Sequence, residues 1–242
     1  MKRVIFCATP RTGSTMIFDD FRNALGHWPA DSEILYQEII NKRTELDWPT
    51  LWRDIQGSLS AGPVWAVKVM FHYLPYLAQF ISGRTLTKTP PIRQFQPDQV
   101  ASFVKFFGDA TWVHIRRRDV FSQAVSMYMA ESTDVWEDRT GKGAMLRQDR
   151  PVYDRSRLLI YAEDLIKERE QWPELFAHFG IDQLSIDYED AAANYPDYLS
   201  PLFSKLNLQP LSSVPPRRMF KIGDALNEDF ARRLERDYQA RL

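Results

Sequence analysis

Hydroxyl, glycine and arginine residues gather in one short stretch near the start of the sequence. Hydroxyls and backbone N–H groups donate hydrogen bonds to anions, and an arginine adds a permanent charge on a planar fork of donors. Such residues bind an anion best where a helix begins, because its first N–H groups are unpaired and the helix dipole is positive there. The stretch is a candidate anion cradle, with candidate contacts Arg11, Thr12, Gly13, Ser14 and Thr15.

The residues on either side predict the elements that position this cradle. Val4 to Cys7 is an apolar run of about the length of a buried parallel strand. From Ser14 onward the apolar residues have helical spacing, at Met16, Ile17, Phe21 and Leu25. The sequence therefore predicts strand, tight turn and helix, a pattern that also fits an ordinary helix with a hydroxyl N-cap.

The cradle lacks two residues of a nucleoside-triphosphate loop. That loop reads G-x-x-x-x-G-K-[ST], whereas here Ala8 replaces the first glycine and Ser14 the lysine. The missing lysine would contact the β- and γ-phosphates, so its absence argues against ATP or GTP chemistry. A phosphatase loop built on Cys7 and Arg11 is also disfavoured, because the two residues are too close to wrap a phosphate and Cys7 lies in the predicted strand.

A second basic turn follows another apolar run. Residues 110–115 predict a strand, residues 116–119 read Arg-Arg-Arg-Asp, and residues 120–129 continue with helical spacing. Asp119 suits the N-cap of that helix. Runs of arginine usually lie on the solvated surface. A run between a buried strand and a helix with hydroxyl residues is better evidence for an anion site.

Three residues of this second unit are candidate anion contacts. Arg117 lies at the carboxyl edge of the predicted strand. Ser122 and Ser126 are four residues apart, so they share one face of the helix. Two strand–turn–helix units on one parallel sheet indicate a ligand with two separated anionic groups.

Two further charged residues could act on such a ligand. Lys68 lies inside the apolar run 63–70, which predicts a strand. A buried unpaired lysine is costly, so its ammonium is expected beside an anion at the strand end, or else in solvent. Glu33 follows the first helix, where the chain can return over the cradle. Without other information, its carboxylate reads as an ordinary surface group near a helix start.

Composition bounds the class of protein. The chain has 242 residues, 44% of them hydrophobic, which is enough for one large α/β domain over residues 1–242. The net charge of −1 gives no reason to expect nucleic-acid binding, and one cysteine excludes a disulfide framework. With no secretory h-region and no membrane-length apolar run, we expect a cytoplasmic protein. The four histidines are scattered without metal-ligand spacing, so no metal is expected; they are His27, His72, His114 and His178.

The remaining patterns predict further elements. Helices are expected over 71–82, 99–107, 157–179 and 198–206, a helix C-terminus at Gly180, and a strand over 184–188. Residues 132–157 are polar and charged and predict a loop, and such loops often shape a binding pocket.

Several of these stretches resemble the sulfotransferases. ATPRTGST resembles their 5′-phosphosulfate loop, and IRRRDVFSQAVSMYMAESTDVW resembles their 3′-phosphate motif, particularly that of the bacterial Stf0-type family. WAVKVMF is similar to that family's Gly-Lys-Leu-Met-Trp strand, DSEIL to its acidic segment, and LSIDYEDAAANYPDYLSPLFSKLNL to its late strand and helix. The resemblance covers most of the chain. It implies a three-layer, P-loop-like α/β fold with a central parallel sheet flanked by helices.

The resemblance also implies a donor and a mechanism. The cradle would hold the 5′-phosphosulfate of 3′-phosphoadenosine-5′-phosphosulfate (PAPS), and Arg117 with Ser126, or Ser122 in its place, would hold the 3′-phosphate. The Pro-stiffened segment 214–221 would close over the nucleotide with Lys221. No metal is required, because a sulfuryl group carries less charge than a phosphoryl group.

Three residues have catalytic roles in this reading. Arg11 and Lys68 would stabilise charge on the leaving phosphate and the sulfuryl oxygens. Glu33 would take the proton of the attacking hydroxyl. Two alternatives stay open: a non-catalytic nucleotide-binding α/β protein, and a divergent P-loop kinase, which Ser14 in place of lysine disfavours.

The acceptor is less well defined than the donor. The resemblance implies a hydroxyl of a small molecule, with a sugar or glycolipid as the best candidate, and by analogy a homodimer. The segment before Glu33 departs from the family pattern, which has Gly-x-Pro ahead of the glutamate and aromatics after it, whereas this chain has Pro-Ala-Asp-Ser and then Ile-Leu. The acceptor side of the site is therefore expected to differ from that of typical members.

Overall fold

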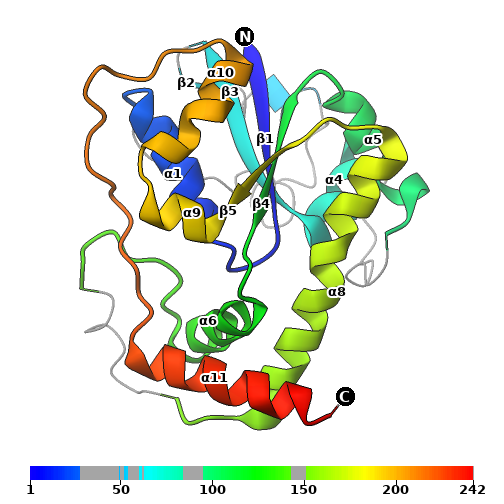
Figure 1. Ribbon diagram of the computed structural model, residues 1–242. Coiled ribbons are helices and arrows are strands. Elements are labelled where there is room, and N and C mark those ends of the chain that lie inside the picture. Colours follow the sequence, from blue (N-terminus) through cyan, green and yellow to red (C-terminus); the bar gives the residue numbers. More distant parts are fainter. Residues whose placement is uncertain are drawn as a thin grey trace.

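Four parallel strands form the centre of the molecule (Figure 1). The computed structural model describes residues 1–27, 49, 52–53, 60–61, 63–83, 95–142 and 151–241. The parallel strands are β1 (Lys2–Ala8), β3 (Val64–Met70), β4 (Thr111–Arg116) and β5 (Leu184–Asp187). A two-residue strand, β2 (Ser60–Ala61), pairs antiparallel with β3, which gives the order β2-β3-β1-β4-β5.

Alternate residues of the strands fill two separate cores. In β1, Val4, Phe6 and Ala8 face one side, and Ile5 and Cys7 face the other; all are buried. Apolar side chains on both faces explain why the strands read as continuous apolar runs. Each face must therefore be covered by helices.

Helices cover both faces of the sheet, as Figure 1 shows. One face packs against α1 (Ser14–Ala24), α9 (Tyr188–Ala193) and α10 (Ser200–Leu206), the last preceded by the 3₁₀ turn η3 (Asp197–Leu199). The other face packs against α4 (Leu74–Ile81), α5 (Pro97–Phe106) and α8 (Arg155–Phe179), with the 3₁₀ turn η2 (Phe71–Tyr73) leading into α4. The expected three-layer α/β fold with a central parallel sheet is confirmed.

A third apolar cluster lies beyond the carboxyl ends of the strands. It joins α6 (Val120–Thr133) and α11 (Ala225–Gln239) to the N-terminal part of α8. The segment 207–224, called the connecting segment below, runs from α10 to α11 along the side of the molecule (Figure 1). The end of the sheet at which β1 and β4 finish is thus enclosed by α6, α11 and this segment.

Most predicted elements are confirmed within two or three residues. The predicted cap residues are also confirmed: Asp119 accepts from the Ser122 N–H at the start of α6, and Gly180 ends α8 in the left-handed conformation. The predicted loop 132–157 is wrong at both ends, because α6 extends to Thr133 and α8 begins at Arg155. The short elements β2 and α9 were not predicted.

Candidate functional site

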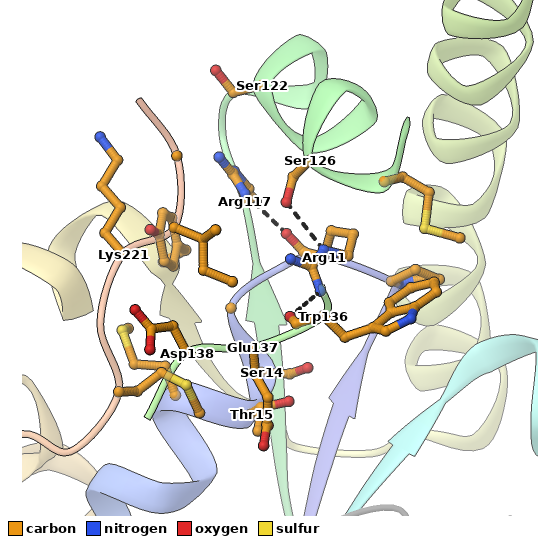
Figure 2. A pocket seen from close by; sticks show the side chains of 18 of the residues that line it. Arg11, Ser14, Thr15, Arg117, Ser122, Ser126, Trp136, Glu137, Asp138 and Lys221 are labelled. Carbon is orange, nitrogen blue, oxygen red and sulfur yellow. Dashed lines mark hydrogen bonds between the residues drawn. The ribbon is translucent and has the colours of Figure 1, made fainter. Parts of the chain in front are cut away.

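A cavity of about 520 Å³ opens at the carboxyl ends of the parallel strands. Such an edge is the usual ligand position in α/β proteins, because the turns after several strands meet there. The cavity is lined by residues of both predicted anion units, by Lys68 on β3 and by the connecting segment (Figure 2). The sheet therefore gathers in one place residues that are far apart in the sequence.

The cradle has the geometry that the sequence predicts. Gly13 is the N-cap of α1 with φ +77°, and among the described residues no side-chain cap is formed at this position. Ser14 and Thr15 line the cavity. Thr12 is buried instead, and its hydroxyl donates to the carbonyl of Thr9 at 2.9 Å, so it stabilises the turn and leaves only its backbone to a ligand.

Gly13 is required for a second, steric reason. A Cβ at this position would lie 2.3 Å from Cδ2 of Tyr188, the first residue of α9. Only glycine therefore combines this left-handed backbone with the close approach of the Tyr188 ring. The same ring lies under the Arg117 guanidinium, 4.7 Å from its carbon to the ring centroid.

Arg11 connects the cradle to the second unit (Figure 2). Its Nε donates to Ser126 Oγ at 3.0 Å, and its Nη1 donates to the Trp136 carbonyl at 2.7 Å. Its own carbonyl accepts from Arg117 Nη1 at 3.0 Å. Arg11 has φ +61°, an uncommon backbone for a residue with a Cβ, and these contacts hold it there.

Arg117 retains donor capacity at the cavity. Its Nε is buried and has no hydrogen-bond partner among the described residues. Burial lowers the pKa of its guanidinium, although arginine stays protonated at neutral pH. Other atoms of Arg117 line the cavity, where its charge suits an anionic ligand.

The two candidate serines of α6 differ in what they contact. The Ser122 hydroxyl donates to the Asp119 carboxylate at 2.6 Å and so belongs to the helix cap. Ser126 Oγ accepts from Arg11 and lies beside Arg117 in Figure 2. Both line the cavity, but Ser126 faces the arginines.

Lys68 lies where the sequence places it. The residue is 3% exposed, near the carboxyl end of β3, and its Nζ donates to Thr15 Oγ1 at 2.8 Å. Its charge is therefore held next to the cradle. Cys7 is fully buried in β1, and burial raises the pKa of its thiol well above the ordinary value, which removes the thiolate that a phosphatase would need.

Lys221 reaches the cavity from the connecting segment and is well exposed, with its Nζ 3.8 Å from Glu228 Oε1. Glu33 and its neighbours, including the acidic segment DSEIL, lie outside the described residues. The structure therefore brings together every predicted site residue that it describes except the Thr12 hydroxyl.

Sequence reasoning missed several residues of the cavity. Tyr188 could have been found, because it is the last residue of the strand predicted over 184–188 and so lies at the carboxyl edge of the sheet, near which Arg117 also lies. Trp136 and Arg217 come from irregular segments that no local pattern places. Among the described residues no group of three or more His, Cys, Asp or Glu side chains could hold a metal ion, and no described helix is long and apolar enough to cross a membrane.

Fold and cavity together define a class: an α/β protein of P-loop-like architecture with a cationic pocket at the carboxyl edge of its sheet. Comparison with known proteins gives the family. Residues 3–237 match the family model described as Stf0 sulphotransferase. The chain belongs to this family and is a sulfotransferase, as the sequence motifs indicated.

Three individual proteins are also similar to this chain. The trehalose 2-sulfotransferase of Mycolicibacterium smegmatis is 26% identical over 219 residues, which are 88% of this chain and 78% of that protein. The trehalose 2-sulfotransferase of Mycobacterium tuberculosis is 28% identical over 142 residues, which are 58% of this chain and 50% of that protein. A sulfotransferase domain from the Synechococcus PCC 7002 olefin synthase has a TM-score of 0.45 at 15% identity, covering 94% of this chain and 82% of that one.

Proposed function

We propose that this sulfotransferase uses PAPS as its donor and transfers the sulfuryl group to a hydroxyl of a sugar or glycolipid. The observation that carries the donor is the meeting of two cationic units in one cavity, joined by Arg11. PAPS bears anionic groups at both its 5′ and 3′ positions, and two separated sites match them. We also propose that residues 1–242 form one sulfotransferase domain and that the protein is cytoplasmic. A homodimer is proposed by analogy with the family.

The proposed roles follow the geometry. The N–H groups of α1 and the hydroxyls of Ser14 and Thr15 bind the 5′-phosphosulfate, with Gly13 giving close access. The Arg117 guanidinium, with Ser126, binds the 3′-phosphate, and Lys221 adds charge from the connecting segment.

Arg11 and Lys68 stabilise the charge that grows on the leaving phosphate and the sulfuryl oxygens. Lys68 is well placed for this, since its ammonium is buried against the first turn of α1. Glu33 takes the proton of the attacking hydroxyl in this proposal, on the family resemblance alone. No metal takes part.

The acceptor is proposed from the relatives and from the cavity wall. Both curated relatives are named trehalose 2-sulfotransferases. The cavity also exposes aromatic rings at Tyr73, Trp136 and Phe220, and such rings can pack on the faces of sugars.

Purified protein with sulfur-labelled PAPS and a panel of sugars, trehalose first, tests the reaction. We expect a labelled sugar product, with turnover that survives EDTA. Loss of turnover on chelation and its return with a divalent ion would favour the kinase alternative. Binding of nucleotide without transfer to any sugar would favour the non-catalytic alternative.

A further inference from the structure

One wall of the cavity carries an imidazole to which no role has been assigned. His72 lies in η2, directly after β3, and lines the cavity together with Lys68, Met70 and Tyr73. Its side chain is 28% exposed. The wall on which His72 lies is thus the one that presents Lys68 to the cradle, and we refer to it as the β3 wall.

A carboxylate from another element orients this imidazole. Glu168, on α8, places Oε1 3.2 Å from His72 Nδ1, and its side chain is 18% exposed. Because a carboxylate only accepts, Nδ1 carries the proton, and Nε2 is left with a lone pair. Glu168 itself is not among the residues that line the cavity, so it supports the ring from behind.

The surroundings restrict the ring further. The Tyr73 ring packs edge-on against the imidazole, with 4.0 Å between the centroids. The charged groups on the neighbouring elements are Glu168 on α8 and Lys68 on β3, and the Lys68 ammonium is directed to Thr15. A histidine held by a carboxylate on one nitrogen is the usual form of a general base.

We propose that His72, oriented by Glu168, is a catalytic base of this site on the acceptor side. Nε2 takes the proton of the acceptor hydroxyl while the hydroxyl oxygen forms a bond to sulfur. The bond between sulfur and the 5′-phosphate oxygen breaks, and its electrons leave with the phosphate. The imidazolium then returns its proton to solvent. This inference rests on the proposed function, and it names a second candidate for the proton acceptor, the role that is assigned to Glu33 by resemblance.

The pH dependence of turnover separates the two candidate bases. A histidine base gives a rate that falls as pH is lowered between about 8 and 5, whereas a carboxylate base gives a fall at more acidic pH. We would measure kcat and kcat/KM from pH 4.5 to 8.5 with PAPS and trehalose, or with the sugar from the panel that is sulfated fastest. The variants are His72→Asn, Glu168→Gln and Glu33→Gln, with the exposed His178→Asn as the matched control.

The expected results differ for each variant. His72→Asn lowers kcat about 10²-fold or more and loses the fall in rate between pH 8 and 5, while affinity for the 3′,5′-bisphosphate product stays within twofold. Glu168→Gln lowers kcat with little change in product affinity, because an amide can donate as well as accept and so no longer fixes the proton on Nδ1. If the contact between His72 and Glu168 only held η2 against α8, replacing His72 would not change the pH profile.

Two results would overturn the inference. One is a His72→Asn variant that keeps kcat within threefold and keeps the wild-type pH profile. The other is loss of the neutral-range fall in Glu33→Gln but not in His72→Asn. A His72→Asn variant that does not fold, judged by bisphosphate binding, is replaced by His72→Gln with the same criteria. If the wild-type protein sulfated no sugar, that result would contradict the proposed function itself.

Discussion

Gly13 is restricted both by its left-handed backbone and by the Tyr188 ring that packs against it. Gly13→Ala would force Tyr188 to move and would strain a left-handed backbone by about 1–2 kcal/mol. We expect affinity for the 3′,5′-bisphosphate to fall more than tenfold, because Tyr188 also packs on Arg117.

Gly83 provides a matched control for this change. It has φ +67°, and no atom of the described residues lies within 4 Å of the position of a Cβ, so we expect Gly83→Ala to add only the backbone strain. Calorimetric titration and urea unfolding of both variants separate the two effects. Wild-type affinity in Gly13→Ala would contradict the packing of Tyr188 against the cradle.

Ser126 is the second residue for which the contacts lead to a prediction, here about binding of the 3′-phosphate. Its hydroxyl accepts from Arg11, whereas the hydroxyl of Ser122 is used in the cap of α6. Because a charge-assisted hydrogen bond is worth about 1.5–3 kcal/mol, Ser126→Ala should weaken binding of the 3′,5′-bisphosphate about tenfold or more. Binding of the 5′-monophosphate should hardly change.

Ser122→Ala is the control for this prediction, since it should leave both affinities within about twofold. Calorimetry with the two nucleotides gives the answer. Equal loss for both nucleotides in Ser126→Ala would mean that this serine acts on the cradle through Arg11 and does not read the 3′-phosphate.

At the scale of elements, the connecting segment is held to α1 by a buried ion pair. Arg217 Nη2 lies 2.8 Å from Asp20 Oδ2, Asp20 is 2% exposed, and Tyr198 donates to the same carboxylate at 2.8 Å. Burial raises the pKa of Asp20, and the Arg217 contact opposes this. Asn23 adds hydrogen bonds to the carbonyls of Pro215 and Pro216.

Removal of Arg217 should therefore destabilise both the fold and the cavity. Arg217→Met leaves Asp20 buried without its cation, which typically costs about 3–5 kcal/mol. Nucleotide affinity should fall as well, because residues 219–224 of the same segment line the cavity. Urea unfolding at pH 7 and calorimetry measure the two effects.

The exposed Arg118 serves as the control, since Arg118→Met removes only surface ion pairs and should cost less than about 1 kcal/mol. The double change Asp20→Asn with Arg217→Met should be less destabilising than Arg217→Met alone, because no buried charge remains. An unaltered unfolding free energy in Arg217→Met would show that Asp20 is neutral in the folded protein.

The elements that the sequence predicts well are those with a long apolar pattern, either a continuous run or helical spacing. β1, β4 and α8 are long enough for their apolar residues to define the element, and the turns at Arg11 and Arg117 follow from their position after strands. This is why the cradle and the second unit could be predicted, together with Lys68.

The parts that were missed depend on contacts across the chain. β2 has two residues and forms only because β3 lies beside it, and α9 is a single short helix after β5. Arg217 and His72 gain their importance from Asp20 and Glu168, which are distant in sequence and carry no local signal.

The stability of the whole molecule should depend on pH through His114. This residue is 5% exposed on β4, and burial lowers its pKa to about 4 from an ordinary value of 6.5. Between these values the unfolded chain binds a proton that the folded protein does not, so the folded state loses stability as pH falls. The loss from pH 7 to pH 5 should be about 2 kcal/mol.

Urea unfolding at several pH values tests this. His114→Leu should lack the His114 contribution to the slope, whereas the exposed His178→Gln should keep the wild-type slope. A His114→Leu protein with an unchanged slope would place the pH dependence in groups other than His114.

The contacts of Arg11 have a consequence for the lengths of ligands that the protein can accept. From the turn before α1, Arg11 contacts the turn before α6 through its carbonyl, the middle of α6 through its Nε and the segment after α6 through its Nη1. The spacing between the two anion units is therefore fixed by covalent geometry and short hydrogen bonds. On the proposed assignment, the cavity selects its donor by the distance between the two anionic groups. Nucleotides in which that distance differs should bind more weakly.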